Sequence, residues 1–196
     1  MDIRSLCIRH QGPLLRILIA GDSAAAGVGV ATQAEALAGR LARHLSPHCT
    51  VQWRLIAVNG LESPGLLALL EATPADRFDV VVLSIGVNDV TGLRAPSKWL
   101  QWQDRLALVI ERRFRPGLLI HCAVPPMHRF SALPQPLRAM HSPFQGSVAG
   151  GLACDGFHPG VVAYNLWTEG LVKRILATPM AASEASSRVT PVSSAA

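Results

Sequence analysis

The stretch from Leu14 to Gly29 reads L-L-R-I-L-I-A-G-D-S-A-A-A-G-V-G, a short apolar run that stops at Gly21-Asp22-Ser23. Such a run is typical of a buried parallel strand, which delivers its last residues to the carboxyl edge of a sheet. Parallel sheets bind ligands and do chemistry at that edge. Ser23 is therefore a candidate nucleophile. In the plainer interpretation Ser23 is the N-cap of a helix and Asp22 a turn residue, and the tripeptide alone favours this second interpretation.

Further along the chain, strand-like and helix-like segments alternate. Apolar runs predict strands over 51–58, 78–85 and 118–124, in addition to the strand that begins at Leu14. Apolar residues at helical spacing, ended by Pro or Gly, predict helices over 32–45, 63–71, 97–114 and 161–176. This alternation predicts a three-layer α/β/α sandwich around a flavodoxin-like parallel sheet with right-handed crossovers.

The chain length fits one domain with a substantial core, because 196 residues bury enough surface on folding. We expect residues 1–12 to form a loose leader and residues 13–177 to form the domain. Residues 178–196 consist largely of Ala, Ser, Thr and Pro and are expected to be a disordered tail.

Composition and charge exclude several functional classes. Hydrophobic residues make up 49% of the chain and charged residues 16%, which indicates a globular protein. The net charge is +5, but the one tight basic cluster, Arg112, Arg113 and Arg115, lies at the end of a predicted helix, where cations complement the dipole. No nucleic-acid motif accompanies it. No apolar run approaches about 20 residues, so we expect no membrane span and a cytoplasmic protein.

The four cysteines are Cys7, Cys49, Cys122 and Cys154. They show neither the spacing of a zinc site nor the density of a disulfide scaffold, so reduced thiols are expected. Cys154 lies beside an acid and near a histidine, which is compatible with a nucleophilic thiol. A small loop residue is the favoured interpretation.

Polar residues and glycines follow the predicted strands at the points where they end. The first strand ends in Gly21-Asp22-Ser23, the second in Asn59-Gly60 and the third in Gly86-Val87-Asn88-Asp89. A fourth element, Asp155-Gly156-Phe157-His158-Pro159, precedes the last helix. Each has a plain explanation alone, as a turn, a cap or a surface residue. Together they supply the nucleophile, the base and the oxyanion donors that acyl transfer needs.

These blocks resemble the SGNH (GDSL-type) hydrolase family, whose motifs centre on Ser, Gly, Asn and His in this order. The matches are Ser23 in G-D-S, Gly60 in V-N-G, Asn88 in G-V-N-D, and Asp155 with His158 in D-G-F-H-P. The resemblance implies a serine acyl-hydrolase, a carboxylesterase on small esters, that needs no metal or organic cofactor. The expected partner is a small-molecule ester, with no nucleic acid or membrane, and the oligomeric state stays open.

The resemblance also implies a role for each residue. Ser23 would attack the acyl carbonyl, His158 would act as general base and then general acid, and Asp155 would orient the imidazole. The oxyanion hole would consist of the Ser23 N–H, the Gly60 N–H and the Asn88 amide. Gly65 is the alternative to Gly60. Asp22 and Asp89 would be structural, bonding the neighbouring loops.

The sequence departs from the family pattern after Pro126. Only 28 residues separate Pro126 from Asp155, where the family fits a long helix and a fifth strand. We therefore expect a four-stranded sheet, mostly irregular structure over 128–154, and an edge strand at 118–124. Trp99, Trp102, Met127 and Phe130 are candidates for lining a pocket, or for ordinary packing.

Two other interpretations of the sequence stay open. One is a non-catalytic flavodoxin- or Rossmann-like protein that cradles a phosphate at residues 21–29. Against it, the loop lacks G-x-G-x-x-G and a P-loop lysine. The other is a catalytically impaired SGNH hydrolase, in which the short 127–154 connection misplaces His158.

Overall fold

A mixed five-stranded sheet forms the centre of the protein, with strand order β1-β3-β2-β4-β5. The computed structural model describes residues 2–8, 12–125, 127, 132–133 and 151–179. Four strands are parallel to one another: β2 (Leu14–Gly21), β3 (Thr50–Ala57), β4 (Val80–Ser84) and β5 (Leu118–His121). These are the four strands that the apolar runs predict. The last one is shorter than expected.

The fifth strand is β1 (Asp2–Ile8), which pairs antiparallel with β3. The register runs from Asp2 opposite Ala57 to Ile8 opposite Val51. The expectation of a loose leader over 1–12 is therefore wrong for residues 2–8, and the expected four-stranded parallel sheet has a fifth, antiparallel strand. The partner of this segment lies more than 40 positions along the chain, and the free edge of β3 is a tertiary feature that no local pattern reveals.

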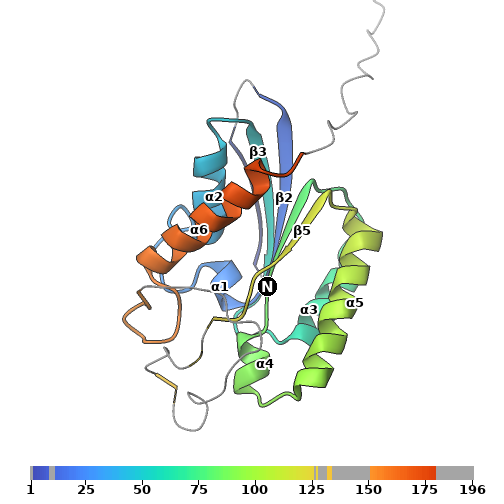
Figure 1. Cartoon of the computed structure of the whole chain (residues 1–196), viewed down its shortest axis with the longest axis vertical. Coiled ribbons are helices and arrows are strands. Elements are labelled where there is room, and N and C mark those ends of the chain that lie inside the picture. Colours follow the sequence, from blue (N-terminus) through green and yellow to red (C-terminus); the bar gives the residue numbers. More distant parts are fainter. Residues whose placement is uncertain (1, 9–11, 126, 128–131, 134–150, 180–196) are drawn as a thin grey trace, which may run out of the picture.

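Helices cover both faces of the sheet (Figure 1). On one face lie α2 (Leu37–Leu45) and α6 (Val161–Leu176), and on the other lie α3 (Ser63–Ala72) and α5 (Pro96–Phe114). Successive residues of the central strand alternate between the two cores. Ile17 and Ile19 belong to the cluster that includes α2 and α6 residues, whereas Leu18 and Ala20 belong to the cluster that includes α3 and α5 residues. The predicted three-layer sandwich is confirmed.

Two single-turn helices, α1 (Ser23–Ala26) and α4 (Val87–Thr91), follow β2 and β4 and lie outside the predicted helix ranges. The helix expected over 32–45 begins only at Leu37. The preceding residues fold back instead, and the side-chain amide of Gln33 donates to the Ala26 carbonyl at 2.7 Å. This contact engages a side chain outside the apolar positions, so the apolar spacing did not indicate it.

Strand β5 lies at one edge of the sheet, and among the described residues its only strand partner is β4. Most of the segment expected to lack the family's fifth strand, residues 134–150, lies outside the described residues. Just after that gap, Leu152 forms an isolated antiparallel bridge with Pro159 rather than pairing with β5. The predicted tail lies outside the described residues from 180 onward. No helix in the described part of the chain has the length and apolarity to cross a membrane.

Candidate active site

Three of the predicted motif loops leave the sheet at the same level. Gly21, the last residue of the central strand, pairs with Ala57 of β3 and with Ser84 of β4. A Cβ on Gly21 would lie 1.8 Å from the Ser84 carbonyl oxygen, so only glycine fits at this position. The loops that carry Ser23, Gly60 and Asn88 therefore start side by side at the carboxyl edge.

Ser23 is the first residue of α1 and is buried. The helix begins here because the Asp22 carboxylate caps it, accepting from the Ala24 N–H at 3.0 Å. The interpretation of Ser23 as the N-cap and Asp22 as a turn residue is therefore wrong, because Asp22 is the N-cap and Ser23 is the first residue of the helix. Among the described residues, the Ser23 hydroxyl has no hydrogen bond. Burial raises the pKa of Asp22 to about 7.

Gly60 lies in the exposed turn after β3 at a φ of 74°. A Cβ placed there would meet nothing within 4 Å, so this backbone is open on its outer side. The alternative, Gly65, is inside helix α3, and its Cβ would meet Leu61 Cδ1 at 2.8 Å. The Asn88 side chain donates through Nδ2 to the Leu61 carbonyl at 3.0 Å. This bond holds the Asn88 amide beside the Gly60 turn.

A buried carboxylate ties these two loops together. Asp89 accepts from the Ser63 backbone N–H at 3.1 Å and from the Ser63 hydroxyl at 2.8 Å, and the Gln103 amide donates to that hydroxyl at 2.9 Å. Burial raises the pKa of Asp89, and the bonds from Ser63 oppose that rise. The structural role expected for Asp89 is confirmed. In the sequence its partner Ser63 is only the start of a predicted helix. Ser63 and Asp89 are 26 positions apart, so no local pattern connects them.

Asp155 and His158 form a close pair in the loop before α6. The Asp155 Oδ2 atom lies 2.6 Å from His158 Nδ1, and Oδ1 accepts from the backbone N–H groups of Phe157 and His158 at 2.9 Å each. The His158 hydrogen bond is the main cause that lowers the pKa of Asp155 to about 2. The carboxylate therefore stays ionised and can hold one imidazole tautomer.

The loop that carries this pair packs against the segment after Ser23. A Cβ on Gly29 would lie 2.3 Å from the Pro159 carbonyl oxygen and 3.1 Å from His158 Cβ. From helix α6, the Tyr164 hydroxyl lies 2.9 Å from the Ala24 carbonyl oxygen and can donate to it. The fold brings the elements that bear Ser23 and His158 together. Among the described residues no hydrogen bond joins the two side chains.

Two of the four candidates for a pocket lining pack beside the motif blocks. Trp99 and Met127 belong to a small apolar cluster that also contains Val87 and Phe157. Trp102 is half-buried on α5, and Phe130 lies outside the described residues. All four cysteines are free, as expected. Cys154 is exposed in the loop just before the Asp155–His158 pair.

The chain is similar to proteins of one known family. Residues 19–150 match the model of the GDSL-like Lipase/Acylhydrolase family. The match includes the blocks of Ser23, Gly60 and Asn88 and stops before Asp155. One curated relative, the GDSL-like esterase Rv1075c of Mycobacterium tuberculosis, is 32% identical over 138 residues. That alignment covers 67% of this chain but only 43% of the mycobacterial protein.

Solved structures with the same fold support the architecture alone, because their identities are low. A member of the lipolytic G-D-S-L family from Veillonella parvula superposes with a TM-score of 0.61 at 13% identity, covering 84% of this chain and 100% of that one. The lipase Lip_vut3 from a goat rumen metagenome gives a TM-score of 0.59 at 18% identity, covering 80% of this chain and 95% of that one.

Proposed function

Because the chain belongs to the GDSL-like lipase/acylhydrolase family, we propose that it hydrolyses carboxylic esters of small substrates through an acyl-enzyme on Ser23. The Asp155–His158 pair carries this proposal. At 2.6 Å, Asp155 engages Nδ1 and leaves Nε2 as the basic nitrogen of a neutral imidazole. That nitrogen is the one a general base needs, and the loop that bears it packs on the segment after Ser23.

The proposed reaction has two halves. In the first, the Ser23 Oγ atom bonds to the acyl carbon while His158 Nε2 takes the hydroxyl proton. The carbon–oxygen bond to the alcohol then breaks, and the imidazolium returns the proton to the departing alkoxide. In the second half, water attacks the acyl-enzyme with His158 again as base, which releases the acid and restores Ser23. Asp155 stays ionised throughout, in keeping with its lowered pKa.

We assign the oxyanion to the backbone N–H groups of Ser23 and Gly60 and to the Asn88 amide. The Leu61 carbonyl holds one Nδ2 hydrogen of Asn88, so the second hydrogen has a defined direction. Such pre-oriented donors act on charge as it develops, and one of them typically contributes about 3 kcal/mol to the transition state. The open space at the Cβ position of Gly60 is compatible with this use.

A fluorophosphonate probe tests the proposal directly, since it labels only an activated serine. We expect stoichiometric labelling of the folded chain, turnover of p-nitrophenyl butyrate, and loss of both in Ser23→Ala. Ser46→Ala is a matched control, because the Ser46 hydroxyl bonds only the Arg43 carbonyl at the end of α2. A folded chain that is not labelled, or a Ser23→Ala variant that still is, would contradict the assignment and favour a non-catalytic ligand-binding protein.

A further inference from the structure

An ion pair joins the two loops that carry the proposed oxyanion donors Gly60 and Asn88. Glu62, two positions after Gly60, accepts from Arg94 Nε at 2.9 Å and from Arg94 Nη2 at 3.2 Å. Arg94 lies just beyond helix α4, which contains Asn88. Two parallel hydrogen bonds give an arginine–carboxylate pair a defined orientation as well as attraction. The pair therefore restrains one loop relative to the other.

Glu62 directs its charge to the neighbouring loop rather than to its own helix. It is the N-cap residue of α3, yet its side chain makes no capping hydrogen bond. The carboxylate lies instead against Gly92, where an added Cβ would be 2.9 Å from Glu62 Oε1. The glycine at this position therefore admits the carboxylate, and α3 begins without a side-chain cap.

The turn that presents Arg94 has a strained backbone. Leu93 has a φ of 56°, a conformation that residues with a Cβ adopt rarely, and its side chain is 66% exposed. Packing therefore contributes little to holding Leu93. The contacts of the next residue hold it, because the Arg94 N–H donates to the Asp89 carbonyl at 2.9 Å and the guanidinium binds Glu62. Such strain persists where neighbouring contacts impose it, and it is concentrated at functional sites.

The donors on both loops depend on how these loops are placed. The Gly60 N–H makes no hydrogen bond among the described residues, so it is available to an oxyanion. A group misplaced by about 1 Å loses much of its effect on the transition state. Resting on the proposed function, we propose that the Glu62–Arg94 pair positions the oxyanion hole by holding the Gly60 turn against the Asn88 loop. Both are positioning residues, which act through the donors and not on the substrate.

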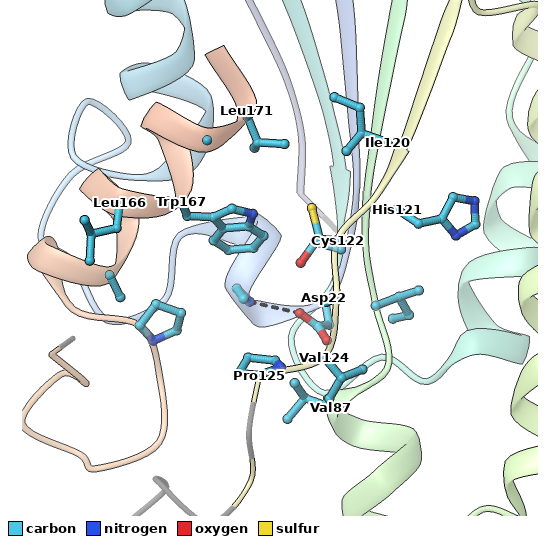
Figure 2. A pocket seen from close by; sticks show the side chains of 17 residues that line it. Asp22, Val87, Ile120, His121, Cys122, Val124, Pro125, Leu166, Trp167 and Leu171 are labelled. Atoms are coloured by element: carbon cyan, nitrogen blue, oxygen red, sulfur yellow. Dashed lines mark hydrogen bonds between the residues drawn. The ribbon is translucent and has the colours of Figure 1, made fainter. Parts of the chain in front are cut away.

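The third proposed donor, the Ser23 N–H, is held by a separate contact. Figure 2 shows the Asp22 carboxylate in the wall of a cavity between β5 and α6, with its hydrogen bond to the Ala24 N–H dashed. This cap fixes the turn that carries Ser23. The two contacts share no residue, so loss of the Glu62–Arg94 pair should leave the nucleophile in place.

The test measures kcat and KM for p-nitrophenyl butyrate in Glu62→Gln, Arg94→Gln and the double variant. Exposed ion pairs change an equilibrium by up to about fivefold, so we expect each single variant to lower kcat about three- to fivefold at unchanged KM. Because the two residues act as one pair, the double variant should be no less active than the less active single variant.

The Glu71–Arg105 pair is the matched control. It joins α3 to α5 at 4.0 Å and lies at the end of α3 that is remote from the two loops. Glu71→Gln and Arg105→Gln should keep the wild-type kcat. A kcat within about 1.5-fold of the wild type in both Glu62→Gln and Arg94→Gln, effects that multiply in their double variant, or a rise in KM alone would overturn the positioning role. If the wild type hydrolyses the ester and Ser23→Ala does not, each of these outcomes leaves the esterase proposal intact.

Amide hydrogen exchange separates the two proposals if no ester is turned over. The Ser63 N–H donates to Asp89 across the two loops at 3.1 Å, so its exchange rate reports how firmly the loops are joined. We expect Arg94→Gln to speed this exchange about three- to fivefold, measured by NMR, and Arg105→Gln to leave it at the wild-type rate. Faster exchange in Arg94→Gln supports the positioning role even without catalysis. Equal rates in Arg94→Gln and the wild type would overturn it.

Discussion

Asp155→Asn separates the chemical role of Asp155 from its structural role. One carboxylate oxygen, Oδ1, holds the loop by accepting from the N–H groups of Phe157 and His158, and an asparagine oxygen can do the same. The other oxygen contacts His158 Nδ1 at 2.6 Å. An amide nitrogen at that place donates to Nδ1, which puts the imidazole proton on Nε2 and removes the base.

The size of the effect follows from the bond that is lost. A hydrogen bond to a charged group contributes about 1.5–3 kcal/mol, which corresponds to about 10- to 150-fold in rate, and the wrong tautomer adds to this. The Asp155 side chain is 44% exposed, so solvent screens part of the interaction. We therefore expect kcat to fall by about 10²–10³, less than the loss of about 10⁴ that is typical of a buried triad aspartate.

Steady-state kinetics on p-nitrophenyl butyrate and thermal unfolding by circular dichroism provide the two readouts. Asp155→Asn should lose activity at an unchanged melting temperature, whereas Asp155→Ala should lose activity and also stability, since the turn loses its acceptor. A kcat for Asp155→Asn within about threefold of the wild type would refute the orienting role. A threefold change in kcat is smaller than the change expected from losing one hydrogen bond to a charged group.

Two other perturbations have outcomes that the structure specifies. Since burial raises the pKa of Asp22 from 3.8 to about 7, the folded state retains a proton that the unfolded state releases, and the stability this provides is present below pH ~4 and lost as pH rises through ~7. Asp22→Asn keeps an acceptor for the Ala24 N–H, so urea unfolding should show a weaker pH dependence over that range, and an unchanged slope would contradict this account. Gly21→Ala places a Cβ 1.8 Å from the Ser84 carbonyl oxygen and should cost about 3 kcal/mol or more, whereas Gly117→Ala, at 3.4 Å from its nearest neighbour, is the tolerant control. Equal melting temperatures for the two glycine variants would show that β2 and β4 can separate at this point.

The apolar runs and helical spacings predicted most of the architecture because these elements are determined by local periodicity. The four parallel strands and helices α3, α5 and α6 lie within a few residues of the predicted ranges. Strand β1, which the patterns missed, depends on a distant partner. It exists through its register with β3, more than 40 positions along the chain, and that partner is not visible within a local window of sequence. The later start of α2 has no such explanation, because the Gln33 contact to the Ala26 carbonyl spans only seven positions.

The candidate site divides in the same way. The motif residues and the close Asp155–His158 pair follow from the sequence by itself, because a separation of three residues in a turn keeps the two side chains within reach of each other. Only the tertiary structure showed that Asp89 binds Ser63, that Gly29 admits the loop of His158, and that a cavity opens between β5 and α6. These features arise where segments far apart in the chain meet. Their geometry depends on how the layers pack, which local residue patterns do not encode.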